Sequence, residues 1–121
     1  MSDPQPLAKV GAVMVDCLDP ERLLEFWGEV LGVEAAQRYP DFIFCTPIPG
    51  NRIRLAFQRV PEEKVVKNRM HFDVTSPDPE SFIARVIELG GSRVADHGDE
   101  AFSWTVLSDP EGNEFCVTAH G

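Results

Sequence analysis

The sequence of 121 residues predicts an α+β domain made of two similar modules. The first observation is an internal repeat, because DPERLLEFWGEVLG begins at Asp19 and DPESFIARVIELGG begins at Asp78, 59 residues later. The second is that segments with strand patterns flank both stretches in the same order. The third is a glycine-containing turn before the last strand of each half, PGN at 49–51 and EGN at 111–113.

Both repeated stretches are expected to form helices. Asp19 and Asp78 suit the N-cap position, where a side-chain oxygen accepts a backbone N–H, and each precedes a proline at the first helical position. Gly32 and Gly90 are placed to end the helices. Apolar residues recur at helical spacing, so each helix has one face to bury: Leu23, Phe26, Trp27, Val30 and Leu31 in the first, and Phe82, Ile83, Val86 and Leu89 in the second.

Segments rich in apolar and β-branched residues precede and follow each helix. They are KVGAVMVD, FIFCT and NRIRLAFQ in the first half, and RMHFDVTS, SRVAD, SWTVLS and NEFCVT in the second. We expect the order strand, helix, strand, strand, strand twice, in module one (about 7–59) and module two (about 68–119) with a linker at 59–67. At this length, with 43% hydrophobic residues, the two modules are expected to form one domain, 1–121.

Composition excludes several classes of protein. The net charge of −9 argues against general nucleic-acid binding, which needs a positive surface. No run approaches 18 apolar residues, and MSDPQPLAKV lacks the features of a secretory signal, so we expect a cytoplasmic protein with no membrane partner. Cys17, Cys45 and Cys116 form no CxxC pair, which argues against a disulfide framework and a zinc knuckle. We expect them to be reduced and mostly buried.

The charge is distributed unevenly along the chain. Residues 52–69 carry a net charge of +4, and the remainder carries −13. The excess comes from six basic residues, Arg52, Arg54, Arg59, Lys64, Lys67 and Arg69. The segment is either a solvated linker, a subunit contact or a local attraction for anions, and the sequence leaves these three interpretations open.

Taken together, the motifs resemble the vicinal oxygen chelate superfamily, that of glyoxalase I, bleomycin-resistance proteins and extradiol dioxygenases. DPERLLEFWGEVLG is similar to the first helix of that superfamily, and DPEGNEFCV to its terminal hairpin and last strand; HFDVTSPDPE also contributes to the resemblance. The resemblance implies paired βαβββ modules whose curved mixed sheet encloses a ligand pocket. It also implies a homodimer, because the pocket often lies at a subunit interface.

In metal-dependent members of the superfamily, the ligands come from the first and last strands of each module. Transferred through the repeat, these positions are Ala12, Arg54, His71 and Cys116. Strand alternation places them on one face together with Met14, Ala56, Gln58, Asp73, Glu114 and Thr118. Their apolar neighbours then face the helices: Val13, Ile53, Leu55, Phe72, Phe115 and Val117.

Two of these four positions are unsuited to a metal ion. Ala12 offers no donor atom, and the Arg54 guanidinium would repel a dication by about 8 kcal/mol at ~4 Å and an effective dielectric constant near 20. His71 and Cys116 alone make a weak site, so no metal cofactor is predicted.

A rearranged metal site of His71, Glu114 and either Asp73 or Gln58 stays open. Glu114 lies two residues from Cys116, about 7 Å along the strand, and would hold an ion at another depth.

Without a metal, the predicted ligand-binding residues are Arg54, Gln58, His71, Trp104, Glu114 and Cys116. Arg54 suits a carboxylate or phosphate, His71 and Asp73 suit a proton-transfer pair, and Trp104 suits an aromatic ligand. Trp27 is expected to pack within the first helix, and His97 and His120 are expected to lie outside the pocket.

The leading hypothesis is therefore a protein that binds or sequesters a small organic ligand, favouring an anion, in a resistance-like role. One rival is a metal-dependent lyase, isomerase or dioxygenase that uses His71 and Glu114. The other is a regulatory module whose important surface is the subunit interface, and the sequence leaves open whether any reaction is catalysed.

Overall fold

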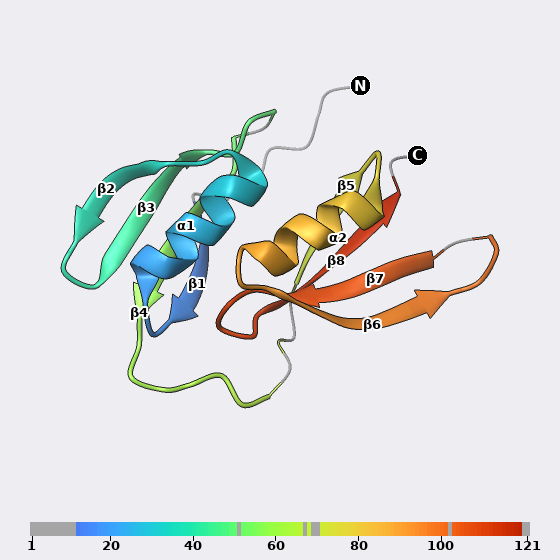
Figure 1. Ribbon diagram of the computed structural model, residues 1–121. Coiled ribbons are helices and arrows are strands. Elements are labelled where there is room, and N and C mark those ends of the chain that lie inside the picture. Colours follow the sequence, from blue (N-terminus) through green and yellow to red (C-terminus); the bar gives the residue numbers. More distant parts are fainter. Residues whose placement is uncertain (1–11, 51, 67, 69–70, 102, 120–121) are drawn as a thin grey trace, which may run out of the picture.

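The computed structural model describes residues 12–50, 52–66, 68, 71–101 and 103–119 and contains two βαβββ modules (Figure 1). Module one comprises β1 (Val13–Cys17), α1 (Pro20–Leu31), β2 (Ala35–Tyr39), β3 (Phe42–Pro47) and β4 (Arg54–Arg59). Module two comprises β5 (Phe72–Ser76), α2 (Pro79–Glu88), β6 (Ser92–Gly98), β7 (Ser103–Ser108) and β8 (Glu114–Ala119). The α+β class and the repeated order of elements are confirmed.

Each module forms its own four-stranded mixed sheet, in the orders β1-β4-β3-β2 and β5-β8-β7-β6. The first strand of each module pairs in parallel with the last strand, and the other pairs are antiparallel. Strands β1 and β5 are therefore sheet edges. Over the part of the chain that the structure describes, hydrogen bonds do not join the two sheets into one continuous cup.

Strand β2 is an element to which the sequence assigned no segment. Its sequence, AAQRY, has no apolar alternation, and from Ala36 to Tyr39 it is exposed to solvent. It forms because β3 supplies an antiparallel partner, with Gln37 opposite Phe44 and Tyr39 opposite Phe42. A strand stabilised mainly by its neighbour leaves little trace in its own sequence.

The start of β4 also differs from the prediction. The strand begins at Arg54, whereas the predicted segment began at Asn51, which lies outside the described residues. Ile53 was expected to pack on the helices but precedes the strand and is 42% exposed. The alternation that would have turned its side chain towards the core does not extend to this position.

The helix ends follow the expected local chemistry. The Asp19 side chain accepts a hydrogen bond from the Arg22 N–H at 3.3 Å, and Asp78 accepts one from the Ser81 N–H at 3.2 Å. Gly32 ends α1 in the left-handed region at φ 72°, a conformation that residues with a Cβ rarely adopt. Both Asp-Pro pairs therefore start helices as predicted.

The two modules share one hydrophobic core on the helix-covered sides of their sheets. Leu55, Phe115 and Val117 are buried in this core as predicted, and Val13 and Phe72 pack against it. The centre of the contact is Trp27 of α1, which meets the Phe72 and Phe115 rings edge-on at centroid distances of 5.8 and 4.8 Å. Aromatic residues of module two thus bury the helix of module one.

Polar contacts fix the β7–β8 turn against module one. The Trp27 Nε1–H donates to Asp109 Oδ2 at 3.0 Å, and Asp109 is only 3% exposed. The Glu111 carboxylate accepts the Leu18 and Asp19 backbone N–H groups at 2.6 and 2.8 Å. These hydrogen bonds hold the turn beside the junction of β1 and α1, where the candidate site lies.

Candidate functional site

A cavity of about 980 Å³ lies between the two modules, beside the edge strands β1 and β5. We call it the intermodule cavity. Its described walls come from β1 and Ala12, from the segment that connects β4 to β5, from His71 and Phe72, and from the β7–β8 turn. The described residues 60–66 of the connecting segment leave the end of β4 as a long yellow-green loop (Figure 1).

The cavity wall combines aliphatic side chains with carboxylates. The described carboxylates are those of Asp16, Glu62, Glu63, Glu111 and Glu114, and the described ammonium group is that of Lys64. Both oxygens of Glu111 already accept backbone N–H groups, so its role is structural. The described part of the wall is therefore negatively charged.

Only some of the predicted site residues lie at this cavity. His71 and Glu114 line it, whereas Arg54 is not among the described lining residues. The Arg54 guanidinium instead donates to the Cys45 carbonyl oxygen at 3.3 Å, so its side chain reaches across to the neighbouring strand β3. An anion held by Arg54 would consequently lie outside the cavity.

Gln58 and Trp104 lie elsewhere on the two sheets. Gln58 is half-buried on β4, opposite Asp16 of β1 and Phe42 of β3. The half-buried Trp104 ring on β7 stacks on the His97 ring at a centroid distance of 5.4 Å. The sequence did not predict this contact between His97 and Trp104, because DHGDE has the composition of a loop although β6 extends to Gly98.

The connecting segment and Asp16 are parts of the site that sequence reasoning missed. The segment was interpreted as a linker or a cationic patch, but its described residues 60 and 62–66 line the cavity. Lys67 and Arg69, which contribute to the predicted positive charge, lie outside the described residues. No local motif signals that a connection will become a wall, because the wall forms only when the modules meet.

The strand register changes which residues correspond between the modules. Asp73 pairs with Cys116 in the second sheet, and Met14 pairs with Ala56 at the same place in the first. Ala56, and not Arg54, is therefore the counterpart of Cys116. Arg54 begins β4 as Glu114 begins β8. The first module still supplies no donor at this place, but the reason is that Ala56 has only a methyl side chain, and not that a cationic arginine occupies the position.

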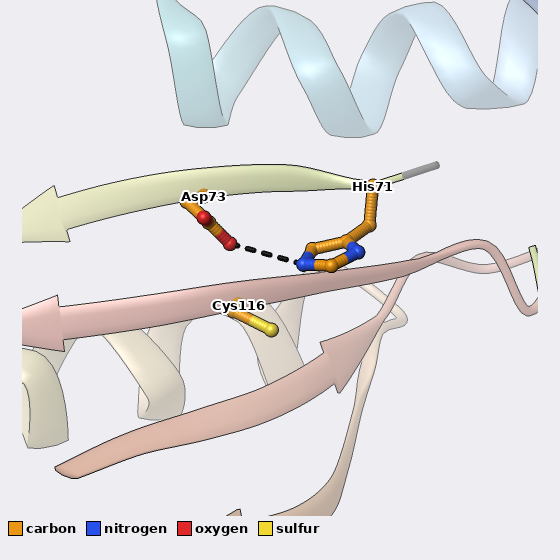
Figure 2. Close-up of side chains that lie close together, drawn as sticks. All are labelled: His71, Asp73 and Cys116. Atoms are coloured by element: carbon orange, nitrogen blue, oxygen red, sulfur yellow. Dashed lines mark ion pairs between the residues drawn. The ribbon is translucent and has the colours of Figure 1, made fainter. Parts of the chain in front are cut away.

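His71, Asp73 and Cys116 converge on the face of the second sheet opposite the helices (Figure 2). His71 Nε2 lies 3.2 Å from Asp73 Oδ1, and one donor atom from each of the three residues lies within 4.8 Å of the others. The imidazole is 41% and the carboxylate 74% exposed, whereas Cys116 is 8% exposed. The group thus combines a buried thiol with two donors that solvent can reach.

The other two cysteines are unsuited to chemistry at neutral pH. Burial, followed by the nearby Glu111 carboxylate, raises the pKa of the Cys17 thiol to about 12. Burial raises the pKa of the Cys45 thiol to about 11. Both stay protonated, and a thiol is a much weaker nucleophile and ligand than a thiolate. All three cysteines are buried and free of disulfides, as expected.

Comparison with known families identifies the chain. A family model described as "Glyoxalase-like domain" matches residues 12–118, nearly the whole sequence. The chain belongs to the glyoxalase-like domain family. This places it in the vicinal oxygen chelate superfamily, as the motifs predicted. A search of curated proteins finds no match.

Solved structures share the fold of this glyoxalase-like domain at low sequence identity. The fosfomycin resistance protein FosX from Listeria monocytogenes, complexed with Mn(II) and 1S,2S-dihydroxypropylphosphonic acid, matches at TM-score 0.76 and 11% identity, covering 97% of this chain and 93% of that one. A glyoxalase/bleomycin resistance protein/dioxygenase family enzyme from Burkholderia phytofirmans matches at TM-score 0.72 and 20% identity, covering 93% and 98%. A glyoxalase-related enzyme from Fulvimarina pelagi matches at TM-score 0.70 and 18% identity, covering 94% and 89%.

The glyoxalase-like domain has donors for a metal ion in its second module. His71, Asp73 and Cys116 provide nitrogen, oxygen and sulfur atoms, whereas Ala12 and Ala56 provide none from the first module. A site assembled from both modules at these positions does not fit this chain, but a three-donor site from module two does.

Neither described helix, of 12 and 10 residues, is long and apolar enough to cross a membrane.

Proposed function

We propose that this glyoxalase-like domain binds a small organic molecule in the intermodule cavity. The observation that carries the proposal is the cavity itself, whose volume of about 980 Å³ suits a ligand of drug-like size. Its apolar wall, which includes Val13, Val15, Val60 and Phe72, would remove the apolar body of such a molecule from water. The carboxylates would then orient a polar group.

The charge of the described wall favours a neutral or cationic ligand. At ~4 Å and an effective dielectric constant near 20, one carboxylate attracts a unit positive charge by about 4 kcal/mol and repels an anion by the same amount. Asp16, Glu62 and Glu114 are placed to exert this attraction, with only Lys64 opposing it among the described lining residues. The anionic ligand expected from Arg54 receives no support from this cavity.

A sequestering, resistance-like role accords with this binding. The names of two structural neighbours include bleomycin resistance and fosfomycin resistance, and both share the fold of this chain. A shared fold at 11–20% identity is an analogy for function, so the role rests on the cavity. Simple binding needs only the walls described above, and no catalytic step is required.

Three probes of similar shape test the proposal: benzyltrimethylammonium, benzyl alcohol and benzoate. Thermal denaturation at increasing concentrations should show stabilisation by the cation, weaker stabilisation by the alcohol and none by benzoate, because a ligand that binds only the folded state raises the melting temperature. Stabilisation by benzoate alone, abolished in Arg54→Ala, would overturn the proposal.

Charge-matched variants locate the binding. Asp16→Asn and Glu114→Gln each remove one carboxylate from the cavity wall. At a separation of ~12 Å across the cavity the attraction falls to roughly 1.4 kcal/mol, so each variant should weaken binding of the cation at least about 10-fold. Glu25→Gln removes an equal charge from the exposed side of α1 and should leave the affinity unchanged. Equal effects of all three variants would indicate a nonspecific attraction to the acidic protein.

A metal-dependent lyase, isomerase or dioxygenase is the second candidate, favoured by the convergence of His71, Asp73 and Cys116. His71 belongs to both this group and the cavity wall, so a ligand in the cavity would lie beside one of the three donors. A metal ion there would supply Lewis-acid activation of a ligand oxygen. The test is turnover of a candidate substrate by the metal-loaded protein, with loss of turnover in His71→Ala.

A further inference from the structure

We propose that His71, Asp73 and Cys116 form a site for a thiophilic divalent cation, Zn²⁺ in the first place, supplied entirely by the second module. The three donors are one imidazole, one carboxylate and one thiolate. Because the site needs no residue of the first module and no organic ligand, it stands independently of ligand binding in the cavity. It specifies the metal centre on which the metal-dependent candidate function rests.

The separations between the donor atoms suit a tetrahedral ion. With Zn–N and Zn–O bonds of about 2.0–2.2 Å and a Zn–S bond of about 2.3 Å, tetrahedral angles put nitrogen and oxygen roughly 3.3 Å apart and nitrogen and sulfur roughly 3.6 Å apart. His71 Nε2 and Asp73 Oδ1 are 3.2 Å apart, already at the chelating distance. All three donors lie within 4.8 Å of one another, so the sulfur needs to approach by about 1.2 Å at most, a distance that small side-chain rotations provide.

The backbone explains why the donors converge. Asp73 and Cys116 are register partners on the parallel strands β5 and β8, which places their side chains on the same face of the sheet. His71 lies two residues before Asp73, and Figure 2 shows its ring turned towards the carboxylate and the thiol. Two regular strands thus fix the positions of Asp73 and Cys116, and the third donor, His71, lies directly before the first residue of β5.

Exposure and charge both suit a bound dication. The thiol lies in the sheet at 8% exposure, while the imidazole and carboxylate retain contact with solvent, so water has access to a fourth coordination position. Three protein ligands with an open fourth position are typical of catalytic zinc sites. A thiolate and a carboxylate together neutralise the charge of the ion.

The thiol determines which ion is preferred. Soft sulfur ligands favour zinc, whereas carboxylate, carbonyl and water ligands suit manganese and magnesium. Any site of this kind binds Zn²⁺ more tightly than Mn²⁺ on the general order of stabilities, so that ranking alone does not reveal the thiolate. The decisive evidence is direct bonding between the ion and the Cys116 sulfur.

Cobalt substitution provides this evidence. Protein stripped of metals under reducing conditions is titrated with Co²⁺. The absorbance of a thiolate-to-cobalt charge-transfer band in the near ultraviolet should increase until one equivalent of Co²⁺ has been added. The band should be absent in Cys116→Ala and present in Cys45→Ala, a matched removal of a buried thiol on the helix-covered side of the first sheet. Circular dichroism of each variant verifies folding. Absence of the band in the native protein, or its persistence in Cys116→Ala, would overturn the proposal.

The relative affinities for Zn²⁺ and Mn²⁺ give a second readout. In competition titrations, Zn²⁺ affinity should fall at least about 100-fold in Cys116→Ala and at least about 10-fold in His71→Ala and Asp73→Asn. Cys116→Asp replaces sulfur with oxygen and should shift the Zn²⁺/Mn²⁺ affinity ratio towards manganese by about 10-fold or more. An unchanged ratio in this variant would contradict a sulfur-bonded ion. No organic probe is used, so these outcomes do not affect the test of the cavity.

Discussion

Replacing Trp27 with phenylalanine tests how the two modules are joined. The indole of Trp27 is 2% exposed, packs on Phe72 and Phe115 of module two, and donates its N–H to the buried carboxylate of Asp109. Trp27→Phe keeps an aromatic ring in the core and removes the donor. Asp109 Oδ2 would then retain the Asn113 side-chain amide at 2.9 Å as its described hydrogen-bond donor.

The expected loss has two parts. A hydrogen bond to a charged group contributes about 1.5–3 kcal/mol, and Asp109 is too buried for water to replace the donor freely. The smaller ring leaves roughly 40 Å³ unfilled, which at ~24 cal/mol per Å³ costs about 1 kcal/mol. The free energy of unfolding should therefore fall by about 2.5–4 kcal/mol.

Urea denaturation followed by circular dichroism measures this loss. With a slope of about 1.5–2 kcal/mol per M, the midpoint should fall by roughly 2 M at unchanged slope. Trp104→Phe is the control, since the half-buried Trp104 lies outside the core cluster, and its loss should stay below about 1 kcal/mol. Equal losses in the two variants, or less than about 1 kcal/mol for Trp27→Phe, would refute this reasoning.

Two further predictions concern stability. Glu111→Gln should destabilise the protein by about 1–2 kcal/mol, because the new amide NH₂ is a donor that faces the Leu18 or Asp19 N–H, so one hydrogen bond is lost. Glu100→Gln in an exposed loop is the control in the same urea assay. Equal stability of the two variants would contradict the contact. The pKa values of Cys17 and Cys45 are raised from 9.0 to about 12 and 11, so unfolded thiols ionise first and stability should fall as pH rises above about 9, by at most about 1.4 kcal/mol per pH unit for each thiol. Cys17→Ala and Cys45→Ala should each flatten this dependence between pH 9 and 11, and an unaltered slope would contradict the raised values.

Local chemistry made the helices predictable. Asp19 and Asp78 cap their helices, a proline follows each, and the apolar spacing of α1 places Trp27 in the core. These signals lie within a few residues of one another and need no knowledge of tertiary structure. The repeated order of strands followed from them, because each helix anchored one copy.

Long-range pairing set the features that the sequence did not reveal. Strand β4 begins four residues after Gly50, whereas β8 begins two residues after Gly112, so counting from the turns matched Arg54 with Cys116 and missed Ala56. A register is fixed by the partner strand, and a shift of two residues keeps the same face and the same alternation pattern. The error was therefore invisible in the sequence.

The candidate site was predictable only in its second module. His71, Asp73 and Glu114 lie on or beside strands whose faces the alternation gave correctly. The cavity wall formed by the connecting segment depends on how the modules pack, and the net charge of 52–69 in the sequence did not foretell that Glu62 and Glu63 would face the cavity. The net charge of a segment of sequence does not predict the net charge of a cavity wall, because only some side chains of the segment face the cavity.

The most direct test of ligand binding in the intermodule cavity is a ¹H–¹⁵N correlation spectrum of the labelled protein titrated with benzyltrimethylammonium. Binding in the cavity predicts saturable shifts of the backbone amides of β1, of Val60, of residues 62–66 and of Glu114, with little change in β2 and β6. Shifts confined to the strands away from the cavity, or no saturable shifts at all, would contradict the central claim.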